Sequence, residues 1–286
     1  MNRLLLFCLS IAITLLGVLD SASAASSTCD ELTGDQKKLS AELLQSQHAY
    51  DCCDKSLAEC LQQKPVCRLV TRLREDVCRR VKAGQSRADI ERHLSHRATS
   101  MSSTGNTYRI DTKDSSPAGK SDAKVTVVAY ICPRCPFCAR LMGELEKSIA
   151  SGKLGDKVKL YARVFPVRSH AGSSEAGLAL LAAEQLGKFW EFLLQLYRDF
   201  DHFDVNKLAE LGAAVGLDKQ KFVEVMNDPK TRDKLVASKK EGVRNAVEST
   251  PTLFINGRKY IGELSLPVIE DVLEEEHERV TGKKYE

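Results

Sequence analysis

The chain has 286 residues, of which 43% are hydrophobic and 28% charged, an ordinary composition for a globular protein. Its length is sufficient for one large or two small domains with hydrophobic cores. The net charge of +3 gives no indication of a nucleic-acid-binding protein.

The N-terminus has the pattern of a secretory signal peptide. Asn2-Arg3 precedes an apolar run from Leu4 to Leu19, and Ala22-Ser23-Ala24 provides a small-residue cleavage site. The run is short for a membrane span. We therefore predict a signal peptide over residues 1–24, cleaved near Ala24, and an exported protein in a compartment where disulfides persist.

Nine cysteines remain after the predicted cleavage, and they fall into two groups. The even N-terminal group predicts structural disulfides, whereas the odd C-terminal group leaves one thiol without an obvious partner. The first group is Cys29, Cys52, Cys53, Cys60, Cys67 and Cys78, and the second is Cys132, Cys135 and Cys138.

Residues 25–101 are predicted to form a cysteine-rich helical region. Residues spaced alternately four and three apart predict one helix over residues 35–63, which Pro65 ends. A second helix follows from Val66 to Val81 with Gly84 as its C′ residue, and Ser86 caps a third. The excess of Arg and Lys over residues 66–97 is interpreted as a solvated face. Residues 102–122 read as a linker with a short strand at Thr107–Ile110.

An antiparallel hairpin turning near Lys64-Pro65 suggests how the N-terminal cysteines pair. In it Cys60 faces Cys67, and Cys53 approaches Cys78. Cys29 with Cys52 is then the remaining pair. Six cysteines allow fifteen pairings, and a metal or redox role for this group is an alternative. The seam over residues 39–60 is also compatible with a homodimer.

A different pattern occupies residues 123–286. Buried strands are predicted at Val125–Ile131 and Val158–Val164, with an amphipathic helix at Pro136–Ala150 between them. Helical patterns fill residues 173–246. Asn256-Gly257 then predicts a type I′ turn between the strands Thr252–Ile255 and Arg258–Ile261, and a helix over Pro267–Val280 closes the chain.

The Cys135-Pro136-Phe137-Cys138 motif lies where the first strand passes into the helix, which is typical of a dithiol redox centre. Unpaired N–H groups and the helix dipole stabilise a thiolate at the first cysteine. The thiolate is the attacking species in disulfide exchange. The alternatives are a plain disulfide or half of a zinc site, although a structural zinc site would need a second pair of ligands.

Four motifs in this order resemble the DsbA-like branch of the thioredoxin fold, the thiol–disulfide oxidoreductases of the bacterial periplasm. The resemblance covers about residues 106–286. It implies a thioredoxin-like α/β fold in residues 123–286 with a helical insertion at about 170–247, preceded by a small disulfide-stapled all-α region. The motifs are Cys135-Pro136-Phe137-Cys138, Val164-Phe165-Pro166 with His170, Gly187-Lys188-Phe189-Trp190 and Thr250 to Gly257.

The resemblance also assigns roles. Cys135 is expected to be the exposed nucleophile and Cys138 the buried resolving thiol. Pro251 is expected to be cis and to hold Thr250 beside the sulfurs, where they bind substrate together with Pro136 and Phe137. No metal or cofactor is implied, because the redox-active disulfide between Cys135 and Cys138 carries the electrons.

Three residues depart from that family pattern. Phe137 replaces the His of strongly oxidising members, so we expect a higher pKa for Cys135 and a less oxidising potential. Ala129 occupies a position where thioredoxin-like proteins often have a buried acid. Cys132 is a possible modulator: it can bridge to Cys135, join a three-thiolate site for Cu(I) or zinc, or remain a free thiol.

The sequence thus predicts an exported oxidoreductase that exchanges disulfides with protein substrates as an oxidase, reductase or isomerase, with the reductase or isomerase favoured slightly over the oxidase. Its expected partners are unfolded or folding exported proteins and a membrane or periplasmic redox partner. The alternative is a cysteine-rich copper- or zinc-binding protein on a thioredoxin scaffold.

Overall fold

The computed structural model of the protein describes residues 27–102, 105–113, 115–150 and 152–285. The predicted signal peptide, residues 1–24, lies outside this range. No helix within the range is long and apolar enough to cross a membrane.

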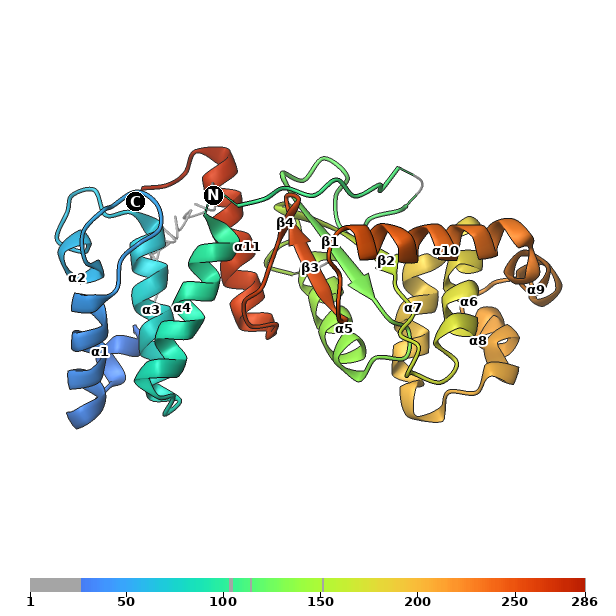
Figure 1. Ribbon diagram of the computed structural model, residues 1–286, viewed down its shortest axis with the longest axis horizontal. Helices are drawn as coiled ribbons and strands as arrows, with labels where there is room; N and C mark the ends of the chain where they lie inside the picture. Colours follow the sequence, from blue (N-terminus) through green and yellow to red (C-terminus); the bar gives the residue numbers. More distant parts are fainter. Residues whose placement is uncertain (1–26, 103–104, 114, 151, 286) are drawn as a thin grey trace, which may run out of the picture.

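A four-stranded sheet in the order β2-β1-β3-β4 forms the centre of the molecule (Figure 1). β1 (Val125–Ile131) pairs in parallel with β2 (Val158–Val164) and antiparallel with β3 (Thr252–Ile255). β1 is almost entirely buried and rich in β-branched residues, as expected for a strand covered on both faces. The two long strands have the predicted bounds.

The hairpin after β3 has the predicted turn but a shorter second strand. Asn256 and Gly257 both have positive φ, 46° and 81°, as a type I′ turn requires. β4 (Arg258–Lys259) has only two residues and pairs antiparallel with β3. The predicted extension of this strand to Ile261 is therefore wrong.

The predicted strand at Thr107–Ile110 is also wrong. Thr107 forms only an isolated bridge with Arg258, and the Tyr108 N–H donates to the Gly257 carbonyl at 2.7 Å. β4 is too short to support a longer ladder at this edge, so the linker crosses it without becoming a strand.

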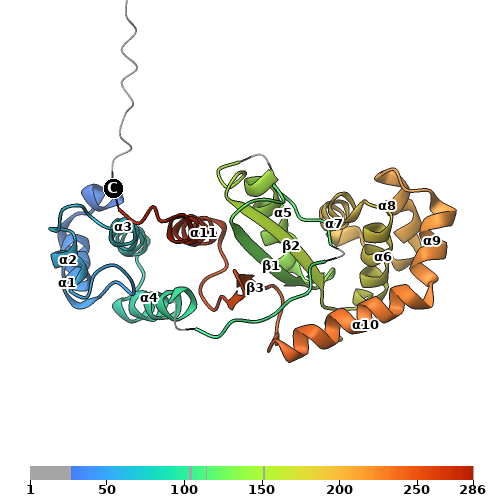
Figure 2. The ribbon, with the colours of Figure 1, turned by 90° about the horizontal axis from the view of Figure 1, so that it is seen from above.

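Helices cover the sheet, and a further group of helices lies beside one of its edges. α5 (Pro136–Ala150) has the predicted bounds, and α11 (Leu266–Thr281) contacts both α5 and β1. Figure 2 shows a group of helices beyond β2, which is the predicted insertion. Its members are α6 (Ser173–Gln185), α7 (Phe189–Arg198), the 3-10 turns η2 (Phe200–His202) and η3 (Val205–Lys207), α8 (Leu208–Ala214), α9 (Lys219–Asn227) and α10 (Pro229–Arg244).

The N-terminal region has its own cluster of buried apolar side chains, separate from the core around the sheet. Two of its three main helices agree with the prediction, including the Ser86 cap and the positive φ of Gly84. Its elements are η1 (Thr28–Glu31), α1 (Gly34–Ser46), α2 (Leu57–Cys60), α3 (Arg68–Lys82) and α4 (Arg87–Met101).

The single helix predicted over residues 35–63 does not form. α1 ends at Ser46, and a loop leads to the short α2, which starts with a capping box between Ser56 and Glu59. Cys52 lies in this loop with φ of +63°, in the left-handed region. The regular spacing therefore reflects two separate segments rather than one continuous helical face.

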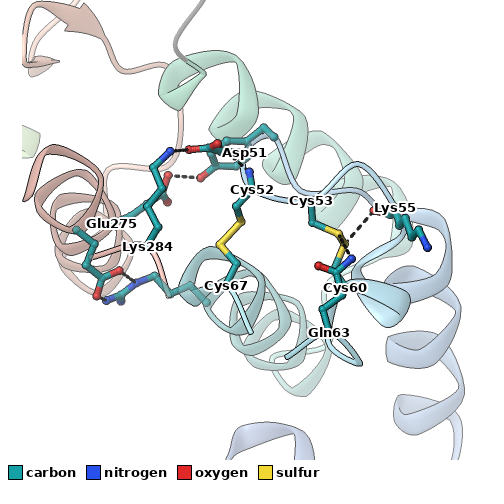
Figure 3. The surroundings of a disulfide bond; sticks show 12 residues. Asp51, Cys52, Cys53, Lys55, Cys60, Gln63, Cys67, Glu275 and Lys284 are labelled. Atoms are coloured by element: carbon teal, nitrogen blue, oxygen red, sulfur yellow. Dashed lines mark hydrogen bonds and ion pairs between the residues drawn. A yellow bond between two sulfur atoms is a disulfide. The ribbon is translucent and has the colours of Figure 1, made fainter. Parts of the chain in front are cut away.

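This break changes the disulfides. The bonds are Cys29–Cys78, Cys52–Cys67 and Cys53–Cys60, so the predicted pairs Cys60–Cys67, Cys53–Cys78 and Cys29–Cys52 are wrong. Because the chain turns between Cys53 and Cys60, these two residues face each other rather than lying along one helix (Figure 3). The three bonds join η1 to α3, the loop to the N-cap residue of α3, and the loop to α2. Such cross-links stabilise a helical core as small as this one.

The basic face of α3 and α4 is not simply solvated, because α11 covers part of it. Figures 1 and 2 both show α11 between the N-terminal helices and the sheet. Arg72 of α3 forms ion pairs with Asp271 at 2.9 Å and with Glu278 at 2.7 Å, both on α11. The charges predicted to face solvent therefore connect the helical region to the sheet domain.

Arg97 is the centre of this contact and is 0% exposed. Its guanidinium lies 3.1 Å from Asp76 on α3, and 2.7 Å and 2.8 Å from Asp271 and Glu275 on α11. Burial raises the pKa of Glu275, whereas hydrogen bonds and nearby cations lower the pKa of Asp76 despite its burial. A buried cation thus neutralises acidic groups from two elements distant in sequence.

Arg97→Ala is expected to reduce the free energy of unfolding by about 3–5 kcal/mol, because it leaves buried carboxylates without their cation. Urea unfolding followed by circular dichroism measures this. Arg92→Gln, on an exposed face of the same helix, should change the free energy by less than about 0.5 kcal/mol. Equal effects of the two substitutions would contradict the role of Arg97.

Candidate redox site

The register of the central strands brings two distant motifs together. Tyr130 of β1 lies opposite Thr252 of β3, and the strands are antiparallel. Continuing this register places the residues after β1 beside Thr250-Pro251, which precede β3. The Thr250–Pro251 peptide bond is cis, as the resemblance implies.

Cys135 and Cys138 are both free thiols at the start of α5. The Cys135 sulfur lies 3.2 Å from the carbonyl oxygen of Thr250, which accepts a hydrogen bond from Cys135 when this residue is protonated. Cys138 is fully buried one turn further along the helix. The structure therefore brings together Cys135, Cys138 and Thr250 as predicted.

The expectation of an exposed nucleophile is wrong, because Cys135 is only 2% exposed. The segment before β3 lies against its sulfur, as the contact with Thr250 indicates. By contrast, Pro136 is exposed and Phe137 is 62% exposed. Pro136 and Phe137 are therefore the motif residues that face solvent.

The two thiols have strongly different acidities. The pKa of Cys135 is lowered to about 5, mainly by a hydrogen bond from the Cys138 thiol. Backbone N–H groups of Phe137 and Cys138 contribute as well, as expected at a helix N-terminus. Burial, together with the adjacent Cys135, raises the pKa of Cys138 far above its ordinary value. At neutral pH the pair is a Cys135 thiolate and a Cys138 thiol.

Cys132 is a buried free thiol whose pKa is raised by burial. Its sulfur lies 3.3 Å from Nδ1 of His170, which belongs to one of the motifs that carry the family resemblance. Its carbonyl accepts hydrogen bonds from the Cys135 N–H at 3.0 Å and from the Tyr197 hydroxyl at 3.3 Å. Cys132 thus supports the turn before the motif through its backbone.

Sequence reasoning did not identify Tyr197 or Arg134. Tyr197 is buried in α7, where its hydroxyl also hydrogen-bonds Cys138, and burial raises its pKa well above 10. Arg134 lies over the rings of Phe200 and Phe203, 4.4 Å and 4.1 Å from their centroids, and thereby fixes the turn to the helical insertion. Neither contact follows from residue spacing, because both depend on where the insertion folds.

The surroundings of the same cysteines bear on the alternative of a copper or zinc protein. Among the described residues, no three His, Cys, Asp or Glu side chains are grouped so that they could hold a metal ion. His170 contacts the Cys132 sulfur, and the Thr250 carbonyl contacts the Cys135 sulfur; both groups can hydrogen-bond sulfur.

The sheet order, the dithiol at the end of β1 and the cis-proline before β3 define a protein of the thioredoxin-fold class. Solved structures share this fold. BdbD from Bacillus subtilis has 21% sequence identity and a TM-score of 0.52, covering 61% of this chain and 98% of its own. Alpha-DsbA1 from Wolbachia pipientis has 18% identity and a TM-score of 0.53, covering 61% and 96%.

The chain belongs to the thioredoxin family, whose sequence profile matches residues 111–275. This match and the solved structures confirm the predicted thioredoxin-like α/β fold, and the buried cluster of the N-terminal helices confirms the helical region before it. Curated relatives include the Na(+)/H(+) antiporters NhaA 1 of Mycolicibacterium gilvum, 29% identical over 156 residues, and NhaA of Herminiimonas arsenicoxydans, 28% identical over 156 residues. The match covers 54% of this chain but only 25% and 24% of those two proteins.

The thiolate absorbance of the reduced protein near 240 nm should titrate with an apparent pKa of about 5. In Cys138→Ala this pKa should rise by at least one unit, because the largest stabilising hydrogen bond is lost. Cys132→Ala, which removes a neighbouring sulfur but not that bond, should leave the titration near pH 5. An unchanged pKa in Cys138→Ala would contradict the assigned cause.

The same shift predicts a pH dependence of stability. Because the pKa of Cys135 is lower in the folded than in the unfolded chain, the thiolate stabilises the reduced form fully above about pH 8.5. This contribution falls as the pH falls from 8.5 and is lost below about pH 5. Urea unfolding should show the free energy of unfolding of the reduced form decreasing relative to that of the oxidised form as the pH falls over that range, because neither cysteine titrates in the disulfide. A constant difference would contradict the shift.

Proposed function

We propose that this protein is an exported thiol–disulfide oxidoreductase that acts on protein substrates through Cys135 and Cys138. The observation that carries the proposal is the division of the pair into a stabilised thiolate and a buried thiol. Disulfide exchange requires a thiolate as the attacking group, and a second thiol to release the product.

In the proposed reaction the Cys135 thiolate attacks one sulfur of a substrate disulfide. A mixed disulfide forms, and the other substrate sulfur leaves as a thiolate that takes up a proton from water. Cys138 then loses its proton and attacks Cys135, which forms the Cys135–Cys138 disulfide and releases the second substrate thiol. Substrate is reduced by two electrons and the protein is oxidised by two; the reverse sequence oxidises a substrate dithiol.

Resolution of the mixed disulfide requires the buried Cys138 to lose a proton. Position 129, where thioredoxin-like proteins often have a buried acid, is an alanine that cannot accept it. Formation of the mixed disulfide removes the negative charge from Cys135, and this charge is one of the causes that raise the pKa of Cys138. The thiol therefore becomes more acidic at the step that needs its thiolate. The Tyr197 hydroxyl interacts with Cys138 and donates to the Cys132 carbonyl, so it stabilises the developing charge by turning its proton from that carbonyl to the sulfur.

The pKa of Cys135 favours a reductase or isomerase over a strong oxidase. A value of about 5 lies between about 3.5 for the oxidant DsbA and about 7 for the reductant thioredoxin. A less stabilised thiolate makes the disulfide form relatively more stable, and one pKa unit corresponds to about 30 mV. Scaling from about −120 mV for DsbA gives a potential of about −170 mV, similar to that of protein disulfide isomerase.

We infer a periplasmic location from the apolar N-terminal run and from the three disulfides of the helical region, which suit an oxidising compartment. The proposed domains are a helical region over residues 25–101, a linker over 102–122 and the redox domain over 123–286. The proposed partners are folding exported proteins, which meet Pro136, Phe137 and Thr250-Pro251, and a periplasmic or membrane redox protein. Cys132 is proposed as a modulator rather than a catalytic residue.

Equilibration with glutathione mixtures should give a reduction potential of about −170 mV for the Cys135–Cys138 pair. Phe137→His should raise it by at least about 20 mV, because a cationic imidazole beside Cys135 stabilises the thiolate further. Mass spectrometry of the alkylated protein reports the oxidised fraction. A potential near −120 mV in the unmodified protein would contradict the inference from the pKa.

Cys135→Ser should abolish catalysed reduction of insulin by dithiothreitol, measured as the turbidity of the released chains. Cys132→Ser is the matched control, since it changes a sulfur three residues away, and it should retain at least about half of the activity. If Cys135→Ser kept full activity, or if the Cys132 variant alone lost it, the assignment of the nucleophile would be wrong.

A further inference from the structure

A cavity of about 490 Å³ lies between the segment after β2 and the start of α6 on one side and α10 on the other. His170 lines it, and this residue touches the Cys132 sulfur through Nδ1. The carbonyl of Cys132 in turn accepts a hydrogen bond from the N–H of Cys135. The cavity is therefore adjacent to the turn that carries the reactive sulfur.

The walls combine an apolar floor with a cationic rim. Leu235, Val236 and Pro166 provide apolar surface, and nearly half of Val236 is exposed. Arg168 and Lys240 are exposed at the rim. Such a surface suits a ligand with both an apolar and an anionic group.

The rim cations are not neutralised by the protein itself. Within the described part of the chain, no acidic side chain forms an ion pair with Arg168, Lys239 or Lys240, and Glu175 is the one acidic residue that lines the cavity. Lys239 instead donates to the Pro166 carbonyl at 2.9 Å and lies 3.2 Å from the centroid of the Phe165 ring. Its pKa is lowered by burial and by the adjacent Arg168.

The start of α6 faces the same space. Its N-cap residue is Gly172, which is in the left-handed conformation. Gly172 has no side chain that could accept a hydrogen bond from the first N–H groups of the helix. Ser173 does not replace it, since its hydroxyl donates to the Val167 carbonyl at 2.8 Å. The helix therefore adds its positive end to the side chains of the rim.

We propose that this cavity binds an acidic segment of the protein substrate, with an apolar side chain on the floor and Asp or Glu carboxylates at the rim. The inference rests on the proposed function and specifies its substrate class. Its position predicts that the acidic residues lie a few residues from the substrate cysteine that reacts with Cys135. The cavity thus selects among disulfides by the charge of their surroundings.

The test uses two peptides, each with one cysteine joined to 2-mercaptoethanol by a disulfide. They differ only in two Glu residues of one that are Gln in the other. Reduced protein should release 2-mercaptoethanol from the acidic peptide about fivefold faster at low salt. In this reaction the protein dithiol becomes a disulfide, and the disulfide between the peptide cysteine and 2-mercaptoethanol is reduced to two thiols. Arg168→Gln with Lys240→Gln should remove this preference and leave the rate with the neutral peptide unchanged.

Arg232→Gln with Lys234→Gln is the matched control, because it removes the same charges from exposed positions of α10 that do not line the cavity. Equal rates with the two peptides, or an equal loss of preference in the control, would overturn the proposal. Binding without disulfide exchange is measured by fluorescence anisotropy with a version of the acidic peptide in which Ser replaces Cys. Binding that depends on the rim while neither peptide reacts would refute the proposed function and keep the site; no rim-dependent binding would refute the site.

Discussion

The pairing of β1 with β3 is the constraint on which the redox site depends. β1 ends directly before the turn that leads to Cys135, and its antiparallel register with β3 brings Thr250-Pro251 to the same end of the sheet. More than a hundred residues separate the two motifs, and the whole helical insertion lies between them. The hydrogen bonds of two buried strands therefore fix the distance between the reactive sulfur and the backbone that covers it.

α11 gives the N-terminal helices a fixed place relative to this sheet. It contacts β1 and α5 with one part of its surface and α3 with another. Its acidic residues form ion pairs with Arg72 and Arg97, so the surface that joins the two cores is charged rather than apolar. Buried ion pairs of this kind depend strongly on geometry, because an unpaired charge costs several kcal/mol. The arrangement favours one defined orientation of the helical region.

Residues 123–286 could be predicted closely because each local signal there agrees with the fold. The β-branched run of β1, the amphipathic pattern of α5 and the Asn256-Gly257 turn each specify one local structure. The N-terminal region was harder to predict. The helical spacing of its residues continues across a loop, and a prediction based on that spacing paired every cysteine wrongly. Within the site, the motif cysteines and Thr250 were predictable, whereas Tyr197, Arg134 and the His170 contact depend on tertiary packing.

Trapping of a substrate tests the central claim most directly. Cys138→Ala, expressed as the full 286-residue chain, should accumulate mixed disulfides with other proteins, and peptide mapping should place them on Cys135. Adducts should disappear on reduction and be absent when Cys135 is also changed to alanine. A Cys138→Ala protein that carries no adducts, or carries them on Cys132, would contradict the account.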